Sequence, residues 1–348
     1  MIVVRLPLIL LLVLVSGACS DADNRAYHDQ FFAFGTLIDV TFYDTDPDLA
    51  ARASETIARD FDTLHREWHA WQPGPLTATN ARLAQLEPSR VDPGLLPVIQ
   101  EANRLARLSG GLFNPTIGRL VALWGFHDNA LPLGTLPDRE AIAALVAQAP
   151  SAEDVVIRDG MISSSNPAVQ YDLGGFAKGY AIDRIMERLR SLGIENAIVN
   201  AGGDLRAIGR HGNRPWRVGI RHPRQEGILA SIEIEGDASI FTSGDYERFF
   251  EVDGTRQHHI IDPRSGYPAA LSTSVTVIHG TAATADAAAT ALFVAGPAQW
   301  TGVARRMGVE LVMLVDTEGM LHMTPGMQQR IRFEPGTNPE LRISEPLS

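Results

Sequence analysis

The sequence predicts an α+β fold: a single compact domain with a largely antiparallel or mixed sheet and flanking helices. From residue 31 onward the chain alternates segments of strand and helix periodicity. Between residues 196 and 242, short apolar segments are separated by turn residues, which is typical of antiparallel strands. No long linker or low-complexity segment divides residues 31–325, so we expect one unit rather than two independent domains.

The elements of the first half follow from apolar periodicity and from breakers. Residues 31–43 alternate apolar and polar side chains and predict a strand that is interrupted at Gly35-Thr36. The breaker Asp46-Pro47 precedes a long helix, whose apolar face runs from Leu49 to Trp68. Two more helices are predicted, over residues 95–108 and 137–148.

In the second half, a helix is predicted from Lys178 to Leu192, with Gly193 as its C-terminal cap. Short strands follow. They are predicted over residues 196–200, 205–208, 216–220, 229–234 and 239–242. The last segment, residues 326–348, has little periodicity and several prolines, so we expect a loosely ordered extension there.

The composition is that of a folded, acidic protein. The 348 residues are 45% hydrophobic and 20% charged, so the chain can bury a sizeable core. The formal net charge of -11 argues against a surface for nucleic acid or for an anionic membrane. An anionic ligand would need local help from a metal ion or from backbone N–H groups.

The first 18 residues are expected to be a signal peptide rather than part of the fold. Arg5 precedes an apolar run over residues 6–15, which is too short for a membrane span, and small residues lead to Cys19. Cys19 is the only cysteine, and its position predicts a lipoprotein processing site. The alternative is an ordinary cleaved signal with an incidental cysteine. In both cases we expect an exported protein, with residues 19–30 as a tether.

A glycine turn before the helix at Lys178 is the first candidate site. Asp172 and Lys178 flank Gly174-Gly175, and the N-terminus of the helix directs free N–H groups and a positive dipole toward this turn. This arrangement favours a bound anion such as a phosphate. A purely structural turn remains equally compatible with the residues alone.

An alanine-rich segment over residues 281–293 is the second candidate site. Alanine favours a helix, and Asp286 and Thr290 are four residues apart, so their oxygens project from the same helix face. Hard oxygen donors at this spacing suit Mg2+. The alternative is that Asp286 only stabilises the helix N-terminus while Thr290 packs.

The third candidate is a polar segment over residues 258–268, which contains two histidines, an aspartate and an arginine. A metal site built from His258 and His259 is not expected, because adjacent strand residues point to opposite faces. One of them, preferably His259, is placed to act as a general base toward a hydroxyl group. A histidine that is merely exposed, or buried and bonded to backbone, is the alternative.

Several of these motifs, together and in this order, resemble the ApbE family of FAD:protein FMN transferases. The resemblance extends over about residues 31–325. Its motifs are Phe34-Gly35-Thr36, Phe113-Asn114-Pro115-Thr116, Trp124-Gly125-Phe126, residues 172–180, Ala201-Gly202-Gly203-Asp204, residues 242–246, residues 259–268 and residues 286–292.

The resemblance implies a Mg2+-dependent enzyme that transfers FMN from FAD, through the FMN phosphate, to a threonine or serine of a target protein and releases AMP. It implies that Asp286 and Thr290 bind Mg2+ by their side chains and Gly175 by its backbone carbonyl. Lys178 and Asp286 are also expected to be catalytic. His259 is our candidate base, with Asp286 or Asp262 as less favoured choices. The implied FAD contacts are Phe34, Trp71, Leu112, Phe113, Asn114, Asp172, Lys178 and Ile260.

Two positions depart from the usual family pattern. Phe34 stands where the family usually has methionine, but an apolar ring can still cover a flat ligand. Asn114 stands where the family usually has aspartate, which exchanges a carboxylate for an amide that can also donate a hydrogen bond. The predicted metal ligands are intact.

Three functions remain open. The leading one is the FMN transferase, with an exported flavin-accepting redox protein as partner. The second is a Mg2+-dependent FAD pyrophosphatase, in which water replaces the target hydroxyl. The third is a non-catalytic flavin-binding lipoprotein. We expect the protein on the periplasmic side of a bacterial membrane, attached only through lipid at Cys19, with the choice of inner or outer membrane open.

Overall fold

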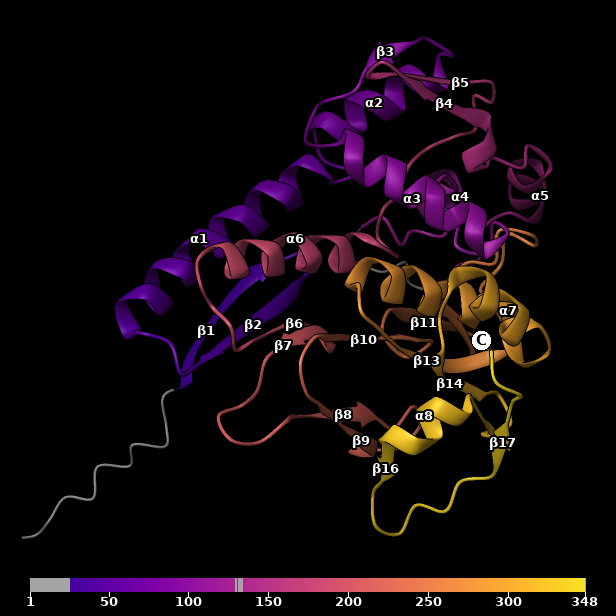
Figure 1. Cartoon of the computed structure of the whole chain (residues 1–348). Coiled ribbons are helices and arrows are strands. Elements are labelled where there is room, and N and C mark those ends of the chain that lie inside the picture. The colour runs from indigo at the N-terminus through magenta and orange to yellow at the C-terminus, as the bar shows by residue number, and fades with distance from the viewer. Residues whose placement is uncertain (1–25, 129, 131–133, 348) are drawn as a thin grey trace, which may run out of the picture.

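A nine-stranded sheet forms the centre of the molecule in the computed structural model, which describes residues 26–128, 130 and 134–347 (Figure 1). The predicted signal peptide and Cys19 lie outside the described residues. Neighbouring strands are antiparallel except for the parallel pair β15 and β17, which confirms the predicted sheet type. In spatial order the strands are β1 (Ala26–Ala33), β2 (Thr36–Tyr43), β6 (Ala197–Ala201), β7 (Asp204–Ile208), β10 (Ala238–Gly244), β13 (Ser272–His279), β14 (Leu311–Asp316), β15 (Leu321–Met323) and β17 (Leu341–Ile343).

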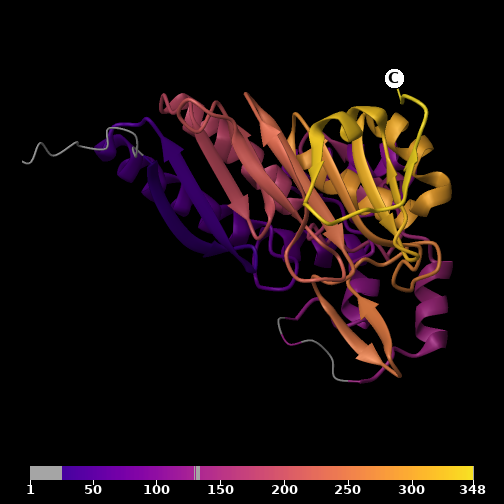
Figure 2. The same cartoon turned by 90° about the horizontal axis from the view of Figure 1, so that it is seen from below.

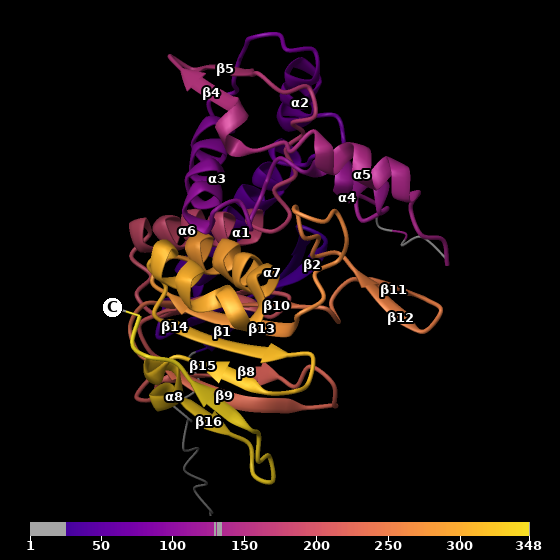
Figure 3. The ribbon, with the colours of Figure 1, turned by 90° about the vertical axis from the view of Figure 1, so that its right-hand side faces the viewer.

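Helices cover one face of this sheet. Figure 3 shows α1, α6 and α7 lying across it, with α3 above them. Alternate side chains of β2, such as Ile38 and Val40, are fully buried beneath this layer together with Phe61 and Phe293. The bounds are α1 (Pro47–Glu67), α3 (Leu96–Ser109), α6 (Ala177–Ser191) and α7 (Ala282–Met307). The predicted helices in these regions are confirmed, and α7 is longer than expected.

The other face is covered by a three-stranded sheet and a short helix (Figure 1). Trp216, Ile232 and Met327 pack there in a second core. The elements are β8 (Trp216–Arg221), β9 (Ile228–Ile234), β16 (Ile331–Phe333) and α8 (Pro325–Arg330).

The prediction of a loosely ordered extension over residues 326–348 is wrong for most of that segment. After α8, β16 pairs with β9, and β17 pairs with β15. Arg305 then donates to the carbonyl oxygens of Pro346 and Leu347. These strands have only three residues each, so their own periodicity is too short to show in the sequence, and long-range pairing holds them.

The N-terminal limit of the domain also differs from the prediction. β1 begins at Ala26, so residues 26–30 belong to the sheet rather than to a tether. Tyr27 stacks on Phe42 of β2, with their ring centroids 5.9 Å apart. Alternating polar residues on this edge strand hide its start from a search for apolar residues.

A third group of elements lies beyond the helical layer (Figures 1 and 3). It includes the predicted helix near residue 140 and two helices that the sequence did not indicate, α2 and α4. A β11–β12 hairpin projects from the body (Figure 2), and its Phe250 packs on Phe126. The bounds are α2 (Pro75–Ala84), β3 (Ser89–Arg90), α4 (Gly118–Leu123), α5 (Arg139–Ala147), a 3-10 turn (Ala152–Asp154), β4 (Val155–Arg158), β5 (Met161–Ser164), β11 (Phe249–Val252) and β12 (Thr255–His258). In the described part of the chain, no helix combines the length and the apolar character needed to cross a membrane.

One carboxylate joins α6 to the start of α7. Asp183 accepts the backbone N–H groups of Ala282 and Ala283 at 2.8 and 2.9 Å, and it forms an ion pair with Arg206 of β7. These N–H groups belong to the first turn of α7, and N–H groups in a first turn have no acceptor within their own helix. Asp183 therefore holds the helical layer and the sheet together at this point.

We predict that Asp183→Ala lowers the free energy of unfolding by about 2–4 kcal/mol, because the change removes two helix-capping bonds and one partner of a mostly buried ion pair. Asp183→Asn retains an acceptor oxygen and should cost less. Urea titration followed by circular dichroism measures both. The control is Glu55→Ala, which removes an exposed partner of Arg59 and should change the free energy by no more than about 0.5 kcal/mol. Equal effects of Asp183→Ala and Glu55→Ala would contradict this role.

Candidate functional site

The site forms where the first turns of α6 and α7 meet. The backbone N–H of Gly179 donates to Asp286 Oδ2 at 2.9 Å. A Cβ atom on Gly179 would lie only 2.4 Å from the carbonyl oxygen of Ala282, so no side chain fits there. This close approach fixes the buried carboxylate of Asp286 beside the predicted glycine turn.

Lys178 lies in the same turn of α6 and forms an ion pair with Asp204 at the start of β7. The other oxygen of Asp204 accepts the N–H of Thr242 at 2.9 Å, which links the lysine to β10. Burial opposes the charge of Lys178, but the carboxylates of Asp204, Asp286 and Glu247 together raise its pKa. Lys178 therefore stays protonated and can stabilise a negative charge.

Burial raises the pKa of Asp286 to about 7, although the positive charge of Lys178 acts in the opposite direction. Its Oδ1 takes part in no hydrogen bond among the described residues. The protein thus places a carboxylate in a site where a cation would favour its charged form.

The other two predicted metal ligands are neighbours. An added Cβ on Gly175 would lie 3.3 Å from Thr290 Oγ1 and 3.7 Å from the ring of Phe113. The Ser243 hydroxyl lies 3.4 Å from Thr290 Oγ1. A carboxylate, a hydroxyl and a backbone carbonyl are hard oxygen donors, so these residues fit Mg2+. Within residues 26–128, 130 and 134–347, no group of three or more His, Cys, Asp or Glu side chains is arranged to hold a metal.

Asp172 and Trp71 form one wall of the site. The indole N–H of Trp71 donates to Asp172 Oδ2 at 2.9 Å, and the N–H of Gly174 donates to Oδ1 at 2.7 Å. The carboxylate thus orders both the glycine turn and a flat aromatic side chain. The ring of His127 packs against the Trp71 indole, with the ring centroids 5.1 Å apart.

Phe34 occupies the turn between β1 and β2 in a left-handed conformation, with φ of 51°. A bulky residue rarely adopts this conformation, so the surrounding contacts must hold it there. Its ring packs against Phe61, His65 and Trp68 at centroid distances of 6.2, 5.4 and 6.2 Å. In the described part of the chain, the ring of Phe34 and the ring of Trp71 have different aromatic partners.

Asn114 uses its amide inside the chain. It donates to the carbonyl of Pro150 at 2.9 Å and accepts from the N–H and the hydroxyl of Thr116 at 3.0 and 2.7 Å. An aspartate could make the two bonds to Thr116 but could not donate to Pro150 in its ionised form. Its neighbour Phe113 is buried and packs on Phe176.

His259 directly follows the β11–β12 hairpin, and its N–H donates to the carbonyl of Arg248. Its Nδ1 is buried without a hydrogen-bond partner among the described residues. Burial, with further contributions from His258, Arg248 and Lys178, lowers the pKa of His259 to about 3. A neutral imidazole with an unpaired buried nitrogen is rare and marks a functional candidate. The next residue, Ile260, is buried.

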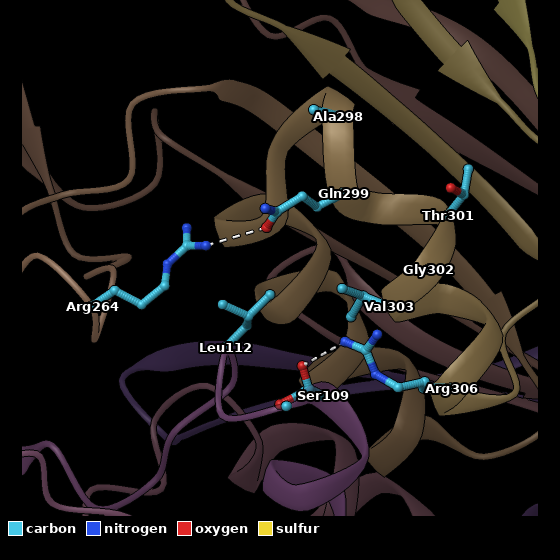
Figure 4. A pocket seen from close by; sticks show the side chains of 10 residues that line it. Ser109, Leu112, Arg264, Ala298, Gln299, Thr301, Gly302, Val303 and Arg306 are labelled. Carbon is cyan, nitrogen blue, oxygen red and sulfur yellow. Dashed lines mark hydrogen bonds between the residues drawn. The ribbon is translucent and has the colours of Figure 1, made fainter.

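A surface cavity of 530 Å³ lies apart from these contacts, between the end of α3 and the second half of α7 (Figure 4). Arg264 donates to Gln299 across it, and Arg306 donates to the carbonyl of Ser109. Of the predicted flavin-binding residues, only Leu112 lines this cavity. The other predicted residues therefore do not converge there.

The prediction missed two charged residues at the site. Asp204 forms an ion pair with Lys178. Burial raises the pKa of Glu247, while the positive charge of Lys178 lowers it. Asp204 ends the motif Ala201-Gly202-Gly203-Asp204, and Glu247 directly follows the motif of residues 242–246. Their proximity to Lys178 depends on contacts between residues far apart in the sequence, so the residue spacing carried no signal for it.

The model of the ApbE family matches residues 34–313. The FAD:protein FMN transferase of Rhodobacter capsulatus is 41% identical over 311 residues, which are 89% of this chain and 59% of that protein. One from Klebsiella pneumoniae (strain 342) is 33% identical and covers 90% of this chain and 96% of its own length. The crystal structure of the ApbE protein from Thermotoga maritima has a TM-score of 0.80 at 33% identity, over 88% of this chain and 99% of that one.

The fold and the site residues thus define an α+β protein of the flavin transferase class. The chain belongs to the ApbE family. It spans 59% of the length of the Rhodobacter relative and nearly all of the Klebsiella relative. The family resemblance and fold predicted from the sequence are confirmed.

We predict that Gly179→Ala lowers the free energy of unfolding by about 1–3 kcal/mol, because its Cβ would collide with backbone and push α6 away from α7. Gly280→Ala is the matched control. It lies just before α7, has no atom within 4 Å of the added Cβ, and should change the free energy by no more than about 0.5 kcal/mol. Urea unfolding of both variants tests this, and a Gly179→Ala protein as stable as the control would contradict the packing argument.

Proposed function

We infer that this chain is a FAD:protein FMN transferase that moves FMN from FAD to a hydroxyl group of a protein and releases AMP. The observation that carries this proposal is the meeting of Lys178, Gly175, Asp286 and Thr290 where the start of α6 packs against the first half of α7, in a member of the ApbE family. The names of the curated relatives support the same activity.

The residues of the site would each contribute to this reaction in a defined way. Mg2+, when bound by Asp286, Thr290 and the carbonyl of Gly175, would stabilise negative charge on the FAD pyrophosphate. Lys178 remains protonated and would add charge stabilisation at the same place. The positive dipole end of α6 would favour an anion near the glycine turn, although the Gly179 N–H already donates to Asp286. Trp71 would offer a flat surface for a ring of FAD, fixed by Asp172.

We propose that His259 accepts the proton of the attacking hydroxyl. The bond that forms joins this oxygen to the FMN phosphorus, and the bond that breaks joins the same phosphorus to the oxygen of the AMP leaving group. The unpaired Nδ1 of His259 supports this role, because in the tautomer that carries its proton on Nε2 this nitrogen has an unused lone pair that can accept the proton. Its low pKa keeps it neutral before the reaction.

Hydrolysis of FAD to FMN and AMP is the second candidate, because water can attack the same phosphorus with the same residues. Only an acceptor hydroxyl distinguishes the two reactions. We further propose that the acceptor is an exported redox protein, and that this chain is a lipoprotein attached through Cys19 on the periplasmic side of the membrane. The support for the anchor is the leader sequence alone.

We predict that Asp286→Ala lowers the rate of FMN transfer by about 10²- to 10³-fold, because it removes the carboxylate on which the proposed metal site depends. The measurement incubates the protein without its leader with FAD, Mg2+ and a flavin-accepting domain, and follows AMP release and acceptor mass. A mass gain of one FMN supports the transferase. AMP release with an unmodified acceptor would favour the pyrophosphatase, and bound FAD without AMP would favour a binding protein.

We predict that His259→Asn lowers the rate of transfer by about 10²- to 10⁴-fold and leaves FAD binding nearly unchanged, as expected for a group that acts on a proton in the reaction. Because the pKa of His259 is lowered to about 3, its protonation should contribute no inflection to the rate between roughly pH 5 and pH 7. A titration near pH 6.5 that disappears in His259→Asn would contradict the neutral, buried state of this residue.

A further inference from the structure

His69 lies in the connection between α1 and α2 and has no role in the function derived above. Its Nδ1 accepts the backbone N–H groups of Trp71 and Gln72, both at 3.1 Å. An imidazole nitrogen that accepts a hydrogen bond carries no proton, so His69 holds its proton on Nε2. One side chain therefore closes the turn that presents Trp71.

Trp68 and Ala70 pack into the main core, but few other side chains hydrogen-bond to the backbone of this turn. Residues 68–74 form no helix or strand, and the next side chain that binds this backbone is Thr77, which contacts Gln72 and Gly74. Burial and the neighbouring His65 lower the pKa of His69, while Asp172 acts in the opposite direction. The acceptor form of Nδ1 is thus the favoured one, and the ring of His65 packs against His69 at a centroid distance of 5.2 Å.

Asp172, which accepts the hydrogen bond from the Trp71 indole, lies in a segment that is itself held by hydrogen bonds. Asn80 of α2 donates to the carbonyl of Tyr171 and accepts its N–H, and the N–H of Asp172 donates to the carbonyl of Pro115. Asp172 is therefore fixed by backbone contacts on both sides. The bond from the Trp71 indole to Asp172 then depends on whether the turn at His69 keeps Trp71 in place.

We propose that His69 is a positioning residue: through its two hydrogen bonds it sets the orientation of the Trp71 indole, and it thereby sets the affinity for the flavin nucleotide rather than the rate of the chemical step. This rests on the proposed function, in which Trp71 contacts FAD. His69 itself touches neither the proposed metal ligands nor Lys178 among the described contacts.

The chain offers a matched control for the turn. After β8, His222 Nδ1 accepts the N–H groups of Arg224 and Gln225 at 3.1 and 3.0 Å, which is the same pair of bonds in another loop. An asparagine can replace either histidine in such a turn, because its side-chain oxygen accepts the N–H two residues later.

The test measures FAD affinity by flavin fluorescence and the transfer kinetics of His69→Ala, His69→Asn and His222→Ala. We expect about tenfold weaker FAD binding and a higher KM for FAD in His69→Ala with kcat nearly unchanged, recovery in His69→Asn, and no change in His222→Ala. In a Trp71→Ala background, His69→Ala should have no further effect on affinity. The proposal would be overturned if His69→Ala bound FAD as tightly as wild type. It would also be overturned if His69→Ala weakened FAD binding just as much in the Trp71→Ala background.

A measurement without ligand separates this proposal from the proposed function. The indole N–H of Trp71 should be protected from solvent exchange in wild type and His69→Asn, and less protected in His69→Ala, as read by NMR. Protection that follows this pattern in a protein that does not bind FAD would sink the proposed function but keep the positioning role. Unchanged protection in a folded His69→Ala variant would overturn the positioning role alone.

Discussion

The contact between α6 and α7 at Gly179 is the constraint on which the site depends. The absence of a side chain lets the backbone of α6 reach the carbonyl of Ala282 and donate to Asp286. One helical turn later, Asp183 binds the free N–H groups at the start of α7. These contacts hold the two helix N-termini side by side. The relative position of Lys178 and Asp286 is therefore set by the backbones of α6 and α7 rather than by a direct bond between the two side chains.

This arrangement produces a mixed electrostatic environment. Asp204, Asp286 and Glu247 lie close enough to Lys178 to raise its pKa, in a protein whose net charge is already strongly negative. A dianionic pyrophosphate that approached these carboxylates alone would be repelled, because charges interact strongly when they are removed from water. The carboxylates would attract a metal cation, and that cation together with Lys178 would attract the phosphates. The same residues therefore explain why metal and nucleotide are expected to bind as a pair.

Local patterns in the sequence predicted the parts of the site that lie on one element. The glycine turn and the amphipathic run after Lys178 indicated α6, and the spacing of Asp286 and Thr290 indicated a shared helix face. Residues whose contacts are with residues far away in the sequence were not predicted. Asp204 meets Lys178 only after β7 pairs within the sheet, and His69 gains its role from a turn that has no periodic pattern. The short strands near the C-terminus were missed because partners far along the chain, and not their own residues, make them strands.

The amide of Asn114 limits which residues this position can accept. Its donor group faces the carbonyl of Pro150, in a loop where Ala149 already adopts a positive φ of 44°. An ionised aspartate there would place two acceptors against each other. An aspartate at residue 114 is therefore compatible with this loop only if its carboxyl group is protonated or if residues 149–150 move away from it.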